Sequence, residues 1–550
     1  MSFSNTHAQP TLTNKTNEAR MEILKKPFQE IPQFSSKDIA YATKNAKLKP
    51  FYKYPVQIES FPKIIQDKKS DLINRTVLAD TLSAQYQQFG KEEAVLQNIE
   101  ALRDENTFTI ITAHQPSLFT GPLYYILKIV STIRLTEELN QQYSDFRFVP
   151  VFISGSEDHD FEEINHTNLF GKTLEWSNEE SGACGMMQTD SLQDVLAELK
   201  DILGTSDRAT HAYHLIEQAY TQYPTYGQAA QALVYKLFSG YGLVVANMND
   251  PALKRLFIPF MEKEIFESFS INYVTETQKS LDKVGFGDQA YAREINLFYL
   301  RDQVRARIER DGDQFTVVDT EYTFTGAELR TELNNYPERF SPNVVMRPVY
   351  EEVVFPNLAY IGGGGELSYW LERKNQFEAF GVNFPMLIRR NSALWVDKGS
   401  SKRLAKLGLE IHDLFQETED LLKAFVKSNT ENEINLGQEK VELEAILLKI
   451  SEKANEVDPS LKGKVMAENA KIIKSVENLE GRLMRAEKQR YEISLNQIRA
   501  LRDKLFPGGG LQERHDNFLG LYMKYGQDLF EILKADLHPL EEGMVIFIEG

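Results

Sequence analysis

The spacing of apolar residues changes several times along the chain, and each change marks a different predicted element. Residues 71–98 show apolar positions at helical spacing. Residues 107–112 form a short run rich in β-branched side chains, which is typical of a buried strand. A helical pattern at 123–139 and a second strand pattern at 146–154 follow. Strand, helix and strand in this order predict a βαβ unit, and therefore a parallel sheet whose functional edge lies at the carboxyl ends of its strands.

The pattern continues less regularly as far as residue 395. Residues 170–230 are irregular and hold most of the remaining helical segments. A third strand is predicted at 242–248, and the sequence Asn249-Asp250-Pro251 after it is typical of a helix start. Alternation at 303–318, with a hairpin turn at 310–313, predicts a small β-rich insert. The sheet is predicted to resume at 357–361 and at 384–388.

Beyond about Trp395 the composition shifts to Glu, Lys, Leu and Ala, with apolar residues every three or four positions. One helix is predicted to end before Asp458, and the next begins at Pro459 and meets no proline until Pro507. At 1.5 Å per residue, about 45 residues form a rod on the order of 70 Å long. The predicted seam comprises Leu443, Ile446, Ile450, Val457, Leu461, Val465, Ile472, Val476, Leu479, Leu483 and Ala486.

Two adjacent helices of this kind predict an antiparallel coiled coil. The hairpin could stand alone as a solvated element without a partner, or it could join two chains. We favour a homodimer, because so long a rod has more apolar seam than its own partner helix needs to cover.

The 550-residue chain carries 62 Lys and Arg against 80 Asp and Glu, a formal net charge of −18. Its length predicts roughly three or four domains or lobes. Hydrophobic residues make up 42 % and charged residues 26 %, which is ordinary for a globular protein and excludes disorder as the main state. The acidic excess argues against broad nucleic-acid binding, which needs Lys and Arg to replace phosphate counterions. A small basic nucleotide pocket is still compatible with this charge.

The single cysteine, Cys184, can form neither an internal disulfide nor a cysteine-rich metal site. The first seven residues lack the basic and apolar regions of a secretory signal. No stretch approaches the roughly 18 continuous apolar residues that a membrane span needs. We therefore expect a reducing, cytoplasmic setting and no membrane association.

A polar turn follows the first predicted strand and falls at the functional edge of the sheet. His114 and Gln115 supply side-chain donors there, and the backbone N–H groups of the next helix start could hold an anion. On spacing alone, His114 fits either a structural loop histidine or a residue that contacts a phosphate or a leaving oxygen.

A run of four ionisable residues follows the second strand, directly after Gly155. It consists of Glu157, Asp158, His159 and Asp160. A charge run is usually a solvated face, but carboxylates beside a histidine at this edge could also orient an imidazole or an incoming amine, or bind Mg²⁺. Zinc is not expected, because consecutive residues seldom supply its ligand geometry.

Two further stretches fall later in the chain. Arg347 lies in an apolar, strand-like run at 343–348, where it could pair with a buried acid or clamp a carboxylate or phosphate. The last strand pattern ends in four glycines before a helix that opens at Glu366, so the backbone could approach a ligand closely. A tight turn explains one or two of these glycines, and neither a GxGxxG pattern nor a P-loop is present. The four glycines are Gly362, Gly363, Gly364 and Gly365.

Together these stretches resemble the cysteine-adding enzyme family of bacillithiol biosynthesis. The resemblance rests on residues 114–124, 155–165, 339–348, 366–370 and 511–514, whose order and spacing extend across nearly the whole chain. It implies an α/β fold with a Rossmann-like core, akin to class I nucleotidyl-transferring and aminoacyl-activating enzymes. It also implies a connecting insertion and a C-terminal antiparallel coiled coil used for dimerisation.

The resemblance further implies a ligase that joins the carboxyl of cysteine to the amine of glucosaminyl-malate in an amide bond. Amide formation from a free carboxylate is unfavourable in water, so ATP is the expected co-substrate, with Mg²⁺ accompanying the nucleotide. An adenylate or an acyl phosphate would be attacked by the sugar amine. The expected partners are these small molecules and a second copy of the chain.

The resemblance also assigns roles to individual residues. The acid–His–acid run would orient the substrate and take a proton from the attacking amine, and Arg347 would bind a carboxylate of cysteine or of malate. No metal ligand is expected. No KMSKS-like lysine loop is present, and residues 511–514 could mark a second nucleotide site. The expected catalytic residues are Asp158, His159, Asp160 and Gln115; the substrate-binding residues are His114, Glu157, Asn165, Arg347, Glu366 and Tyr369; the nucleotide-binding residues are Thr120, Gly121, Gly362, Gly363, Gly364 and Gly365.

Four segments follow from this interpretation: 1–170 is the helical lead and the first part of the core, 171–335 the connecting insertion with further core elements, 336–395 the last part of the core, and 396–550 the coiled coil with the C-terminal segment. Two other functions stay open. One is a nucleotidyltransferase of the same fold with another substrate, and the other is a coiled-coil scaffold that keeps a relic pocket. Cys184 lies outside the motifs and is predicted to be dispensable.

Overall fold

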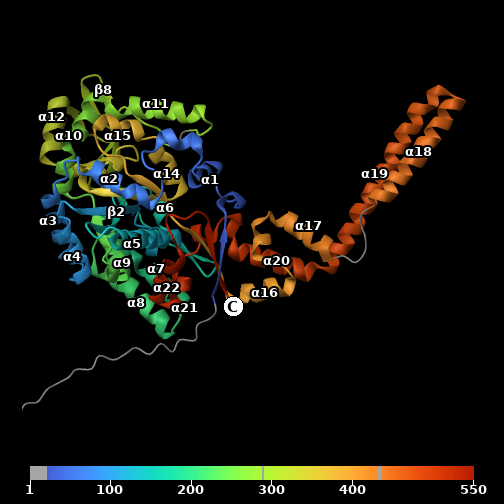
Figure 1. Ribbon diagram of the computed structural model, residues 1–550, viewed down its shortest axis with the longest axis horizontal. Coiled ribbons are helices and arrows are strands. Elements are labelled where there is room, and N and C mark those ends of the chain that lie inside the picture. Colours follow the sequence, from blue (N-terminus) through green and yellow to red (C-terminus); the bar gives the residue numbers. More distant parts are fainter. Residues whose placement is uncertain (1–20, 288–289, 430–435) are drawn as a thin grey trace, which may run out of the picture. The chain divides into compact units, whose positions relative to one another are not determined.

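The computed structural model describes residues 21–287, 290–429 and 436–550, so the first seven residues and the start of the predicted helical lead lie outside it. The chain divides into two compact units. The larger unit comprises residues 22–395 and 510–547, and the smaller contains residues 396–509 with short terminal pieces. Figure 1 labels many of the helices of both units and some of the strands.

A five-stranded parallel sheet forms the centre of the larger unit, as predicted. β2 and β3 pair in register from Thr107 beside Arg147 to His114 beside Ser154, so their carboxyl ends coincide. The polar stretches that follow the two strands therefore start at the same edge. The strands, in spatial order, are β13 (Met386–Arg389), β12 (Asn357–Gly362), β2 (Thr107–His114), β3 (Arg147–Ser154) and β6 (Val244–Asn247).

Helices cover both faces of this sheet (Figure 1). Alternate residues of β2 point to opposite faces, so Ile110 packs into one buried apolar cluster and Ile111 into the other. The first cluster includes residues of α2 and α5, and the second includes residues of α3, α4, α10 and α13. The bounds are α2 (Phe61–Lys68), α3 (Arg75–Tyr86), α4 (Glu93–Ala101), α5 (Tyr124–Gln142), α10 (Pro251–Glu267) and α13 (Arg347–Val354).

The strand-like run predicted around Arg347 is wrong, because Arg347 is the first residue of α13. The side chain of Asn343 accepts hydrogen bonds from the N–H groups of Val345 and Met346, at 2.8 and 3.3 Å, and so forms a turn before the helix. Pro348 then occupies the first helical turn, where its missing N–H costs nothing. The strand prediction rested on the three apolar residues between Asn343 and Pro348, which are Val344, Val345 and Met346.

The β-rich insert predicted at 303–318 is confirmed and belongs to a larger antiparallel sheet. Its hairpin turn contains Gly312, whose φ of 60° favours glycine. In spatial order the strands are β10 (Thr323–Thr325), β9 (Gln314–Val317), β8 (Val304–Asp311), β7 (Leu297–Arg301) and β11 (Phe340–Pro342). A separate two-stranded sheet pairs β4 (His166–Leu169) with β5 (Lys172–Glu175).

The structure also contains a three-stranded sheet that was not predicted from the sequence. It joins β1 (Met21–Lys26), β15 (Met544–Glu549) and β14 (Ser392–Val396), with β15 in the middle. Two of its strands lie at the ends of the described chain and the third, β14, lies about 150 residues before the C-terminal one, so local patterns give no sign of the pairing. The remaining helices of the larger unit are α1 (Ser36–Ala42), α6 (Phe161–Ile164), α7 (Gln193–Leu203), α8 (Asp207–Gln222), α9 (Tyr226–Phe238), α11 (Phe269–Lys283), α12 (Gly326–Asn335), α14 (Gly364–Leu371), α15 (Lys374–Phe380), α21 (Leu519–Tyr525) and α22 (Asp528–Asp536).

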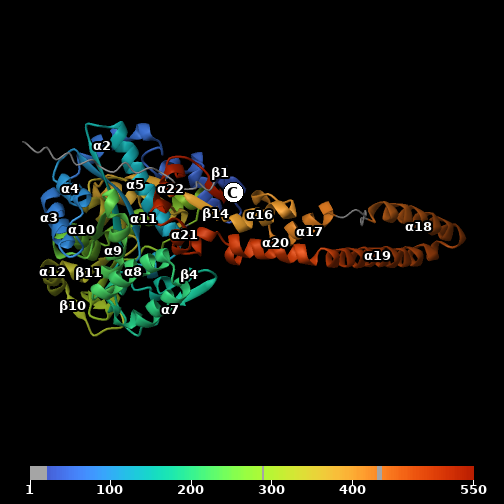
Figure 2. The same cartoon turned by 90° about the horizontal axis from the view of Figure 1, so that it is seen from below.

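The smaller unit is helical and contains the predicted antiparallel pair, α18 (Gly437–Val457) and α19 (Pro459–Arg490). Figure 2 shows the two helices side by side. Lys440 pairs with Glu480 across them, and the side chain of Asn469 donates to the carbonyl of Leu447 at 3.0 Å. The prediction of one unbroken helix to Pro507 is wrong, because α19 ends at Arg490. The other helices are α16 (Lys398–Leu407), α17 (Thr418–Asn429) and α20 (Glu492–Leu505).

Many residues of the predicted seam face solvent in the single chain. Val457 is 82 % exposed and Ile446 54 %, and Leu479 and Leu483 are close to half exposed. The hairpin therefore leaves apolar surface that its own two helices do not cover. Within the described ranges, no helix is long and apolar enough to span a membrane.

Candidate active site

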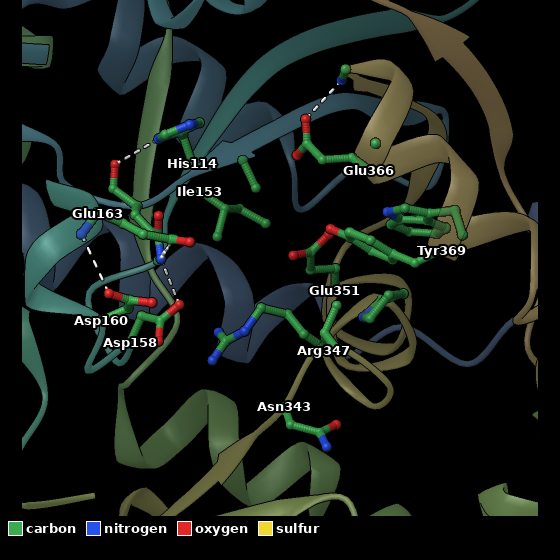
Figure 3. Close-up of a pocket in the computed structure, with 18 of the residues that line it drawn as sticks. His114, Ile153, Asp158, Asp160, Glu163, Asn343, Arg347, Glu351, Glu366 and Tyr369 are labelled. Carbon is green, nitrogen blue, oxygen red and sulfur yellow. Dashed lines mark hydrogen bonds between the residues drawn. The ribbon is translucent and has the colours of Figure 1, made fainter. Parts of the chain in front are cut away.

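A cavity of about 720 Å³ opens at the carboxyl ends of β2, β3 and β12. The loops that follow these strands line it together with the first turns of α13 and α14, as Figure 3 shows. The stretches around Asp158 and Glu366, which follow two different strands, converge on this cavity. The predicted site residues that line it are His114, Gln115, Asp158, His159, Asp160, Arg347, Gly363, Gly364, Gly365, Glu366 and Tyr369.

One side of the cavity consists of loop residues, here called the loop wall: Gln115, Asp158, His159, Asp160 and Glu163. The amide nitrogen of Gln115 donates to Asp158 at 2.7 Å and to Glu163 at 3.1 Å. The backbone N–H of Glu163 donates to Asp160 at 3.3 Å. The polar groups of this wall are thus largely bonded to one another.

Arg305 of β8 reaches this wall and contacts both His159 and Asp158. Its Nη1 lies 2.5 Å from Nδ1 of His159 and 3.4 Å from a carboxylate oxygen of Asp158. A guanidinium can only donate, so Nδ1 of His159 accepts in this contact. Arg305 therefore holds the imidazole and the carboxylate of two neighbouring residues in place.

The carboxyl group of Asp158 is held ionised by its neighbours. Burial alone would raise its pKa, but hydrogen bonds from His159 and Gln115 and the charge of Arg305 outweigh burial and hold the pKa well below its usual range. A carboxylate of this kind is a weak base. Asp158 is accordingly suited to orienting other groups rather than to taking a proton.

His114 is engaged on both sides of its ring. Nδ1 lies 3.0 Å from the carbonyl of Gln115, which can only accept, so Nδ1 carries the proton. Nε2, also at 3.0 Å, then accepts from the hydroxyl of Tyr124. Burial, with the charge of Lys128, lowers the pKa of His114 to about 4, so the ring is neutral at physiological pH. Of the two interpretations of His114, the structural one agrees with these contacts.

The opposite side of the cavity is formed by α13 and the start of α14, here called the helix wall: Arg347, Glu351, Gly363–Gly365, Glu366 and Tyr369. Glu366 accepts from Lys128 at 2.7 Å, from the hydroxyl of Tyr360 at 3.0 Å and from the N–H of Gly363 at 2.7 Å. Its carboxylate therefore fixes the glycine turn from behind. A Cβ on Gly364 would lie 2.0 Å from Cγ of Asp38, so close packing requires this glycine.

Arg347 both pairs with a buried acid and keeps a free donor. Its Nη2 donates to Glu157 at 2.5 Å and to the carbonyl of Pro342 at 3.1 Å. Its Nη1 is buried and has no hydrogen-bond partner among the described residues. Glu157, predicted to bind substrate, does not line the cavity; it is buried behind Arg347, where it also pairs with Lys254.

Glu351 is a lining residue that the sequence analysis missed. Glu351 is only 3 % exposed, and its Oε2 has no hydrogen-bond partner within the described part of the chain. Burial raises its pKa to about 8; Glu352 and Glu366 add to this rise, and Arg347 opposes it. Its spacing of four from Arg347 could have revealed it, had a helix been predicted there.

Four other predicted residues lie away from the cavity lining: Thr120, Gly121, Asn165 and Gly362. Phe119, Thr120 and Gly121 all have positive φ, and the side chain of Asn517 holds this turn by donating to the carbonyls of Phe119 and Gly121. The N–H of Leu123 donates to the carbonyl of Asp516 at 2.8 Å. The C-terminal segment thus occupies the turn and helix start that were predicted to hold an anion.

The motif at 511–514 contributes to the same cavity through Arg514. Glu513 is buried and accepts from Arg390 at 2.8 Å and from the N–H of Ala393 at 2.7 Å. Arg390 and Arg514, which are far apart in the sequence, both line the cavity. Glu513 therefore positions Arg390, and Arg514 adds a second cation nearby.

Cys184 also lies closer to the motifs than its place in the sequence suggested. Its N–H donates to the carbonyl of Asp158 at 2.6 Å, and the N–H of Gly185 donates to the carbonyl of Ser156 at 2.8 Å. The insertion thus supports the loop wall through backbone contacts. Across the described ranges, no three His, Cys, Asp or Glu side chains are grouped so as to hold a metal ion.

Comparisons with known proteins agree with this architecture. Residues 21–391 match the family model described as the N-terminal Rossmann-like domain of bacillithiol biosynthesis BshC, and residues 393–549 match its C-terminal coiled-coil domain. A Flavobacterium johnsoniae protein named "Putative cysteine ligase BshC" is 40 % identical over 516 residues, 94 % of this chain and 97 % of the relative. A protein of the same name from Christiangramia forsetii is 38 % identical over 530 residues, 95 % and 98 % of the two chains.

Proposed function

The chain belongs to the BshC family of bacillithiol biosynthesis, and on that premise we propose that it is a ligase that joins cysteine, through its carboxyl, to the amine of glucosaminyl-malate. The single observation that supports this function best is the composition of the cavity. It combines a wall of fixed carboxylates with a wall that has a free buried donor and a free buried acceptor. Two polar substrates can therefore be held on opposite sides of one space.

We propose ATP as the co-substrate, because it converts a carboxylate oxygen into a leaving group. The start of α14 fits phosphate oxygens: Gly363, Gly364 and Gly365 line the cavity, and N–H groups of a first helical turn lack acceptors in their own helix. Arg390 and Arg514 add positive charge to the lining. Mg²⁺ is expected to enter with the nucleotide.

In this proposal the loop wall receives the amino sugar. Its ammonium group is attracted by Asp160 and Glu163, which are exposed at the cavity. Asp158 is less available to the ammonium, because it already accepts hydrogen bonds from three donors. Asp160 accepts only the N–H of Glu163 in the described structure, so its carboxylate is more accessible to an incoming amine than that of Asp158. His159 and Gln115 keep the loop in place.

The proposal is tested by incubating the purified protein with cysteine, glucosaminyl-malate and ATP and detecting the product thiol by mass spectrometry. Product should need all three substrates, and its absence from a folded protein contradicts the proposal. Pyrophosphate exchange driven by another acid and not by cysteine would favour a different nucleotidyltransferase. Unchanged cellular thiol in an Asp158→Ala, His159→Ala double variant would favour a scaffold.

We also propose a cytoplasmic homodimer formed through α18 and α19. The exposed apolar residues on these helices support this assembly, and they include Val441, Ile446, Leu448, Ile450, Val457, Met466, Ile472, Leu479 and Leu483. Light scattering on the full chain should give twice the monomer mass, and Leu479→Glu with Leu483→Glu should reduce it to the monomer. Arg482→Glu, an exposed charge change on the same helix, is the control. A monomeric wild-type chain contradicts the dimer.

A further inference from the structure

Two polar atoms of the helix wall are buried without a partner among the described residues: Nη1 of Arg347 and Oε2 of Glu351. Both residues are on α13, four positions apart, so their side chains leave the same face one turn from each other. Both line the cavity. Figure 3 shows Arg347 and Glu351 bordering the same part of that space, across from Asp158 and Asp160. Buried polar groups are nearly always paired, so a free donor beside a free acceptor points to a ligand.

The two atoms are complementary to a ligand that carries a carboxylate and an ammonium group close together. We propose that Arg347 and Glu351 form the subsite for an α-amino acid, in which Nη1 of Arg347 donates to the carboxylate and Oε2 of Glu351 accepts from the ammonium. This inference rests on the proposed function, in which the amino acid is cysteine. It assigns the carboxylate partner of Arg347 to the amino acid rather than to malate.

Ligands that carry only one of these two charges satisfy only one of the two atoms. A phosphate or a dicarboxylate pairs with Arg347 but brings no ammonium group to Oε2 of Glu351. A simple amine pairs with Glu351 and leaves Nη1 of Arg347 unbonded. Arg347 cannot turn away, because Glu157 and the carbonyl of Pro342 hold its other terminal nitrogen. An α-amino acid satisfies both groups at once, because its two charged groups are attached to one carbon atom of a small molecule.

Proton binding provides an independent signature of this subsite. Since burial raises the pKa of Glu351 to about 8, its carboxyl is mostly protonated at pH 7 in the free protein. A bound ammonium favours the ionised carboxylate, so the amino acid displaces the proton of Glu351 into solvent. Only the O–H bond of Glu351 breaks in this step, and the ammonium keeps its three protons.

Calorimetry on the full-length protein, without ATP or amino sugar, tests the inference. The ligands are cysteine, 3-mercaptopropionate, which lacks the ammonium, and cysteamine, which lacks the carboxylate. The wild type should bind cysteine at least about tenfold more tightly than either analogue. Glu351→Gln should weaken cysteine about ten- to hundredfold and leave 3-mercaptopropionate unchanged. In buffers of different ionisation enthalpy at pH 7, the wild type should release close to one proton, and the variant should release far less.

Glu352→Gln is the matched control, because Glu352 is the next residue, is fully buried and also has a raised pKa, of about 7, caused by burial. Glu352 bonds to Lys68 and Asn357 and does not line the cavity. This variant should be less stable, because Lys68 loses one of its two ion-pair partners and keeps only Asp71, but its preference for cysteine over 3-mercaptopropionate should be that of the wild type. Circular dichroism of each variant checks the fold, and Glu351→Asp serves if Glu351→Gln does not fold.

The outcomes separate the subsite from the proposed function. Equal loss of cysteine and 3-mercaptopropionate in Glu351→Gln, or loss of neither, overturns the subsite even if the wild type forms product. If the wild type binds serine or alanine better than cysteine, with the same dependence on Glu351, the subsite is supported and the cysteine ligase proposal fails. A wild type that binds no α-amino acid overturns both.

Discussion

The two walls of the cavity differ in how far their polar groups are satisfied. On the loop wall, Asp158 accepts from three donors, and Gln115 and His159 are each tied to a charged neighbour. On the helix wall, Arg347 and Glu351 each keep one buried atom without a partner in the described structure. A satisfied group holds geometry, whereas an unsatisfied buried group gains the most from a ligand. The difference assigns positioning mainly to the first wall and binding to the second.

The charges of the two walls reinforce this contrast. Asp158 has a pKa held low, so it stays ionised with or without substrate. Glu351 has a pKa raised to about 8, so a nearby positive charge changes its protonation. One acid with a lowered pKa and another with a raised pKa in the same cavity are typical of sites where two acids have different roles. Substitutions on the two walls should therefore have different consequences.

Arg347→Lys should have the largest effect on activity. A lysine can replace one contact with Glu157 but cannot supply a second, fixed donor, so the amino acid loses its carboxylate partner. We expect kcat/KM for cysteine to fall by about two to three orders of magnitude, mainly through KM. Arg305→Lys, the same change on the loop wall, should cost only about tenfold. Equal losses in the two variants would contradict the division between the walls.

Asp158→Asn should have a smaller effect, directed at the other substrate. The amide keeps the shape of the side chain but replaces one acceptor oxygen with a donor, so Gln115 or Arg305 loses its partner. We expect KM for the amino sugar to rise about tenfold and cysteine affinity to stay unchanged. Initial rates with each substrate varied in turn provide the measurement. A rise in KM for cysteine alone would reverse the assignment of the two walls.

The sequence predicted the backbone elements that carry this site better than it predicted the partners of the site's charged side chains. The βαβ pattern gave the parallel sheet, and the stretches after β2, β3 and β12 do meet at one edge. Such features depend on short-range periodicity, which a single sequence records. The turn after β2 precedes a helix, as predicted, but the C-terminal residue that occupies it, Asn517, lies almost 400 residues away.

Long-range partners account for most of what the sequence could not predict. Lys128 is on a buried face of α5, yet its ammonium bonds to Glu366, 238 residues later. Glu513 similarly holds Arg390 from 123 residues away. Glu351 was overlooked for a local reason, because the apolar residues before Pro348 suggested a strand and hid the helical spacing. Capping signals such as Asn343 outweigh hydrophobicity at such a boundary.

Glu351→Gln should raise stability in a pH-dependent way. The folded-state pKa of about 8 lies above the ordinary value of 4.5, so between these values the native state binds more protons than the unfolded chain. Raising the pH from 5 to 8.5 therefore destabilises the wild type through Glu351. We expect the variant to match the wild type near pH 5 and to exceed it by about 1–3 kcal/mol in the free energy of unfolding at pH 8.5.

Urea unfolding followed by tryptophan fluorescence measures this difference, because Trp176, Trp370 and Trp395 all belong to the larger unit. Asp158→Asn is the control, because its effect on the free energy of unfolding at neutral pH should have the opposite sign. Native contacts lower the pKa of Asp158 in the wild type, so its ionised carboxylate stabilises the fold at neutral pH, and this contribution is lost only in acid. A constant difference between Glu351→Gln and the wild type across pH 5–8.5 would mean that Glu351 does not change protonation in this range.

Cys184→Ala should have the smallest effect, although Cys184 lies against the loop wall. The contact that supports Asp158 comes from the backbone N–H of Cys184, which alanine retains, and only a buried sulfur is lost. We expect kcat/KM within about twofold of the wild type and a loss of about 1 kcal/mol in stability. The next residue provides the contrast: a Cβ on Gly185 would lie 2.2 Å from Cβ of Ser156, so Gly185→Ala must displace the loop. If Cys184→Ala proves as harmful as Gly185→Ala, the thiol itself takes part in the site, and the loop wall does more than position its neighbours.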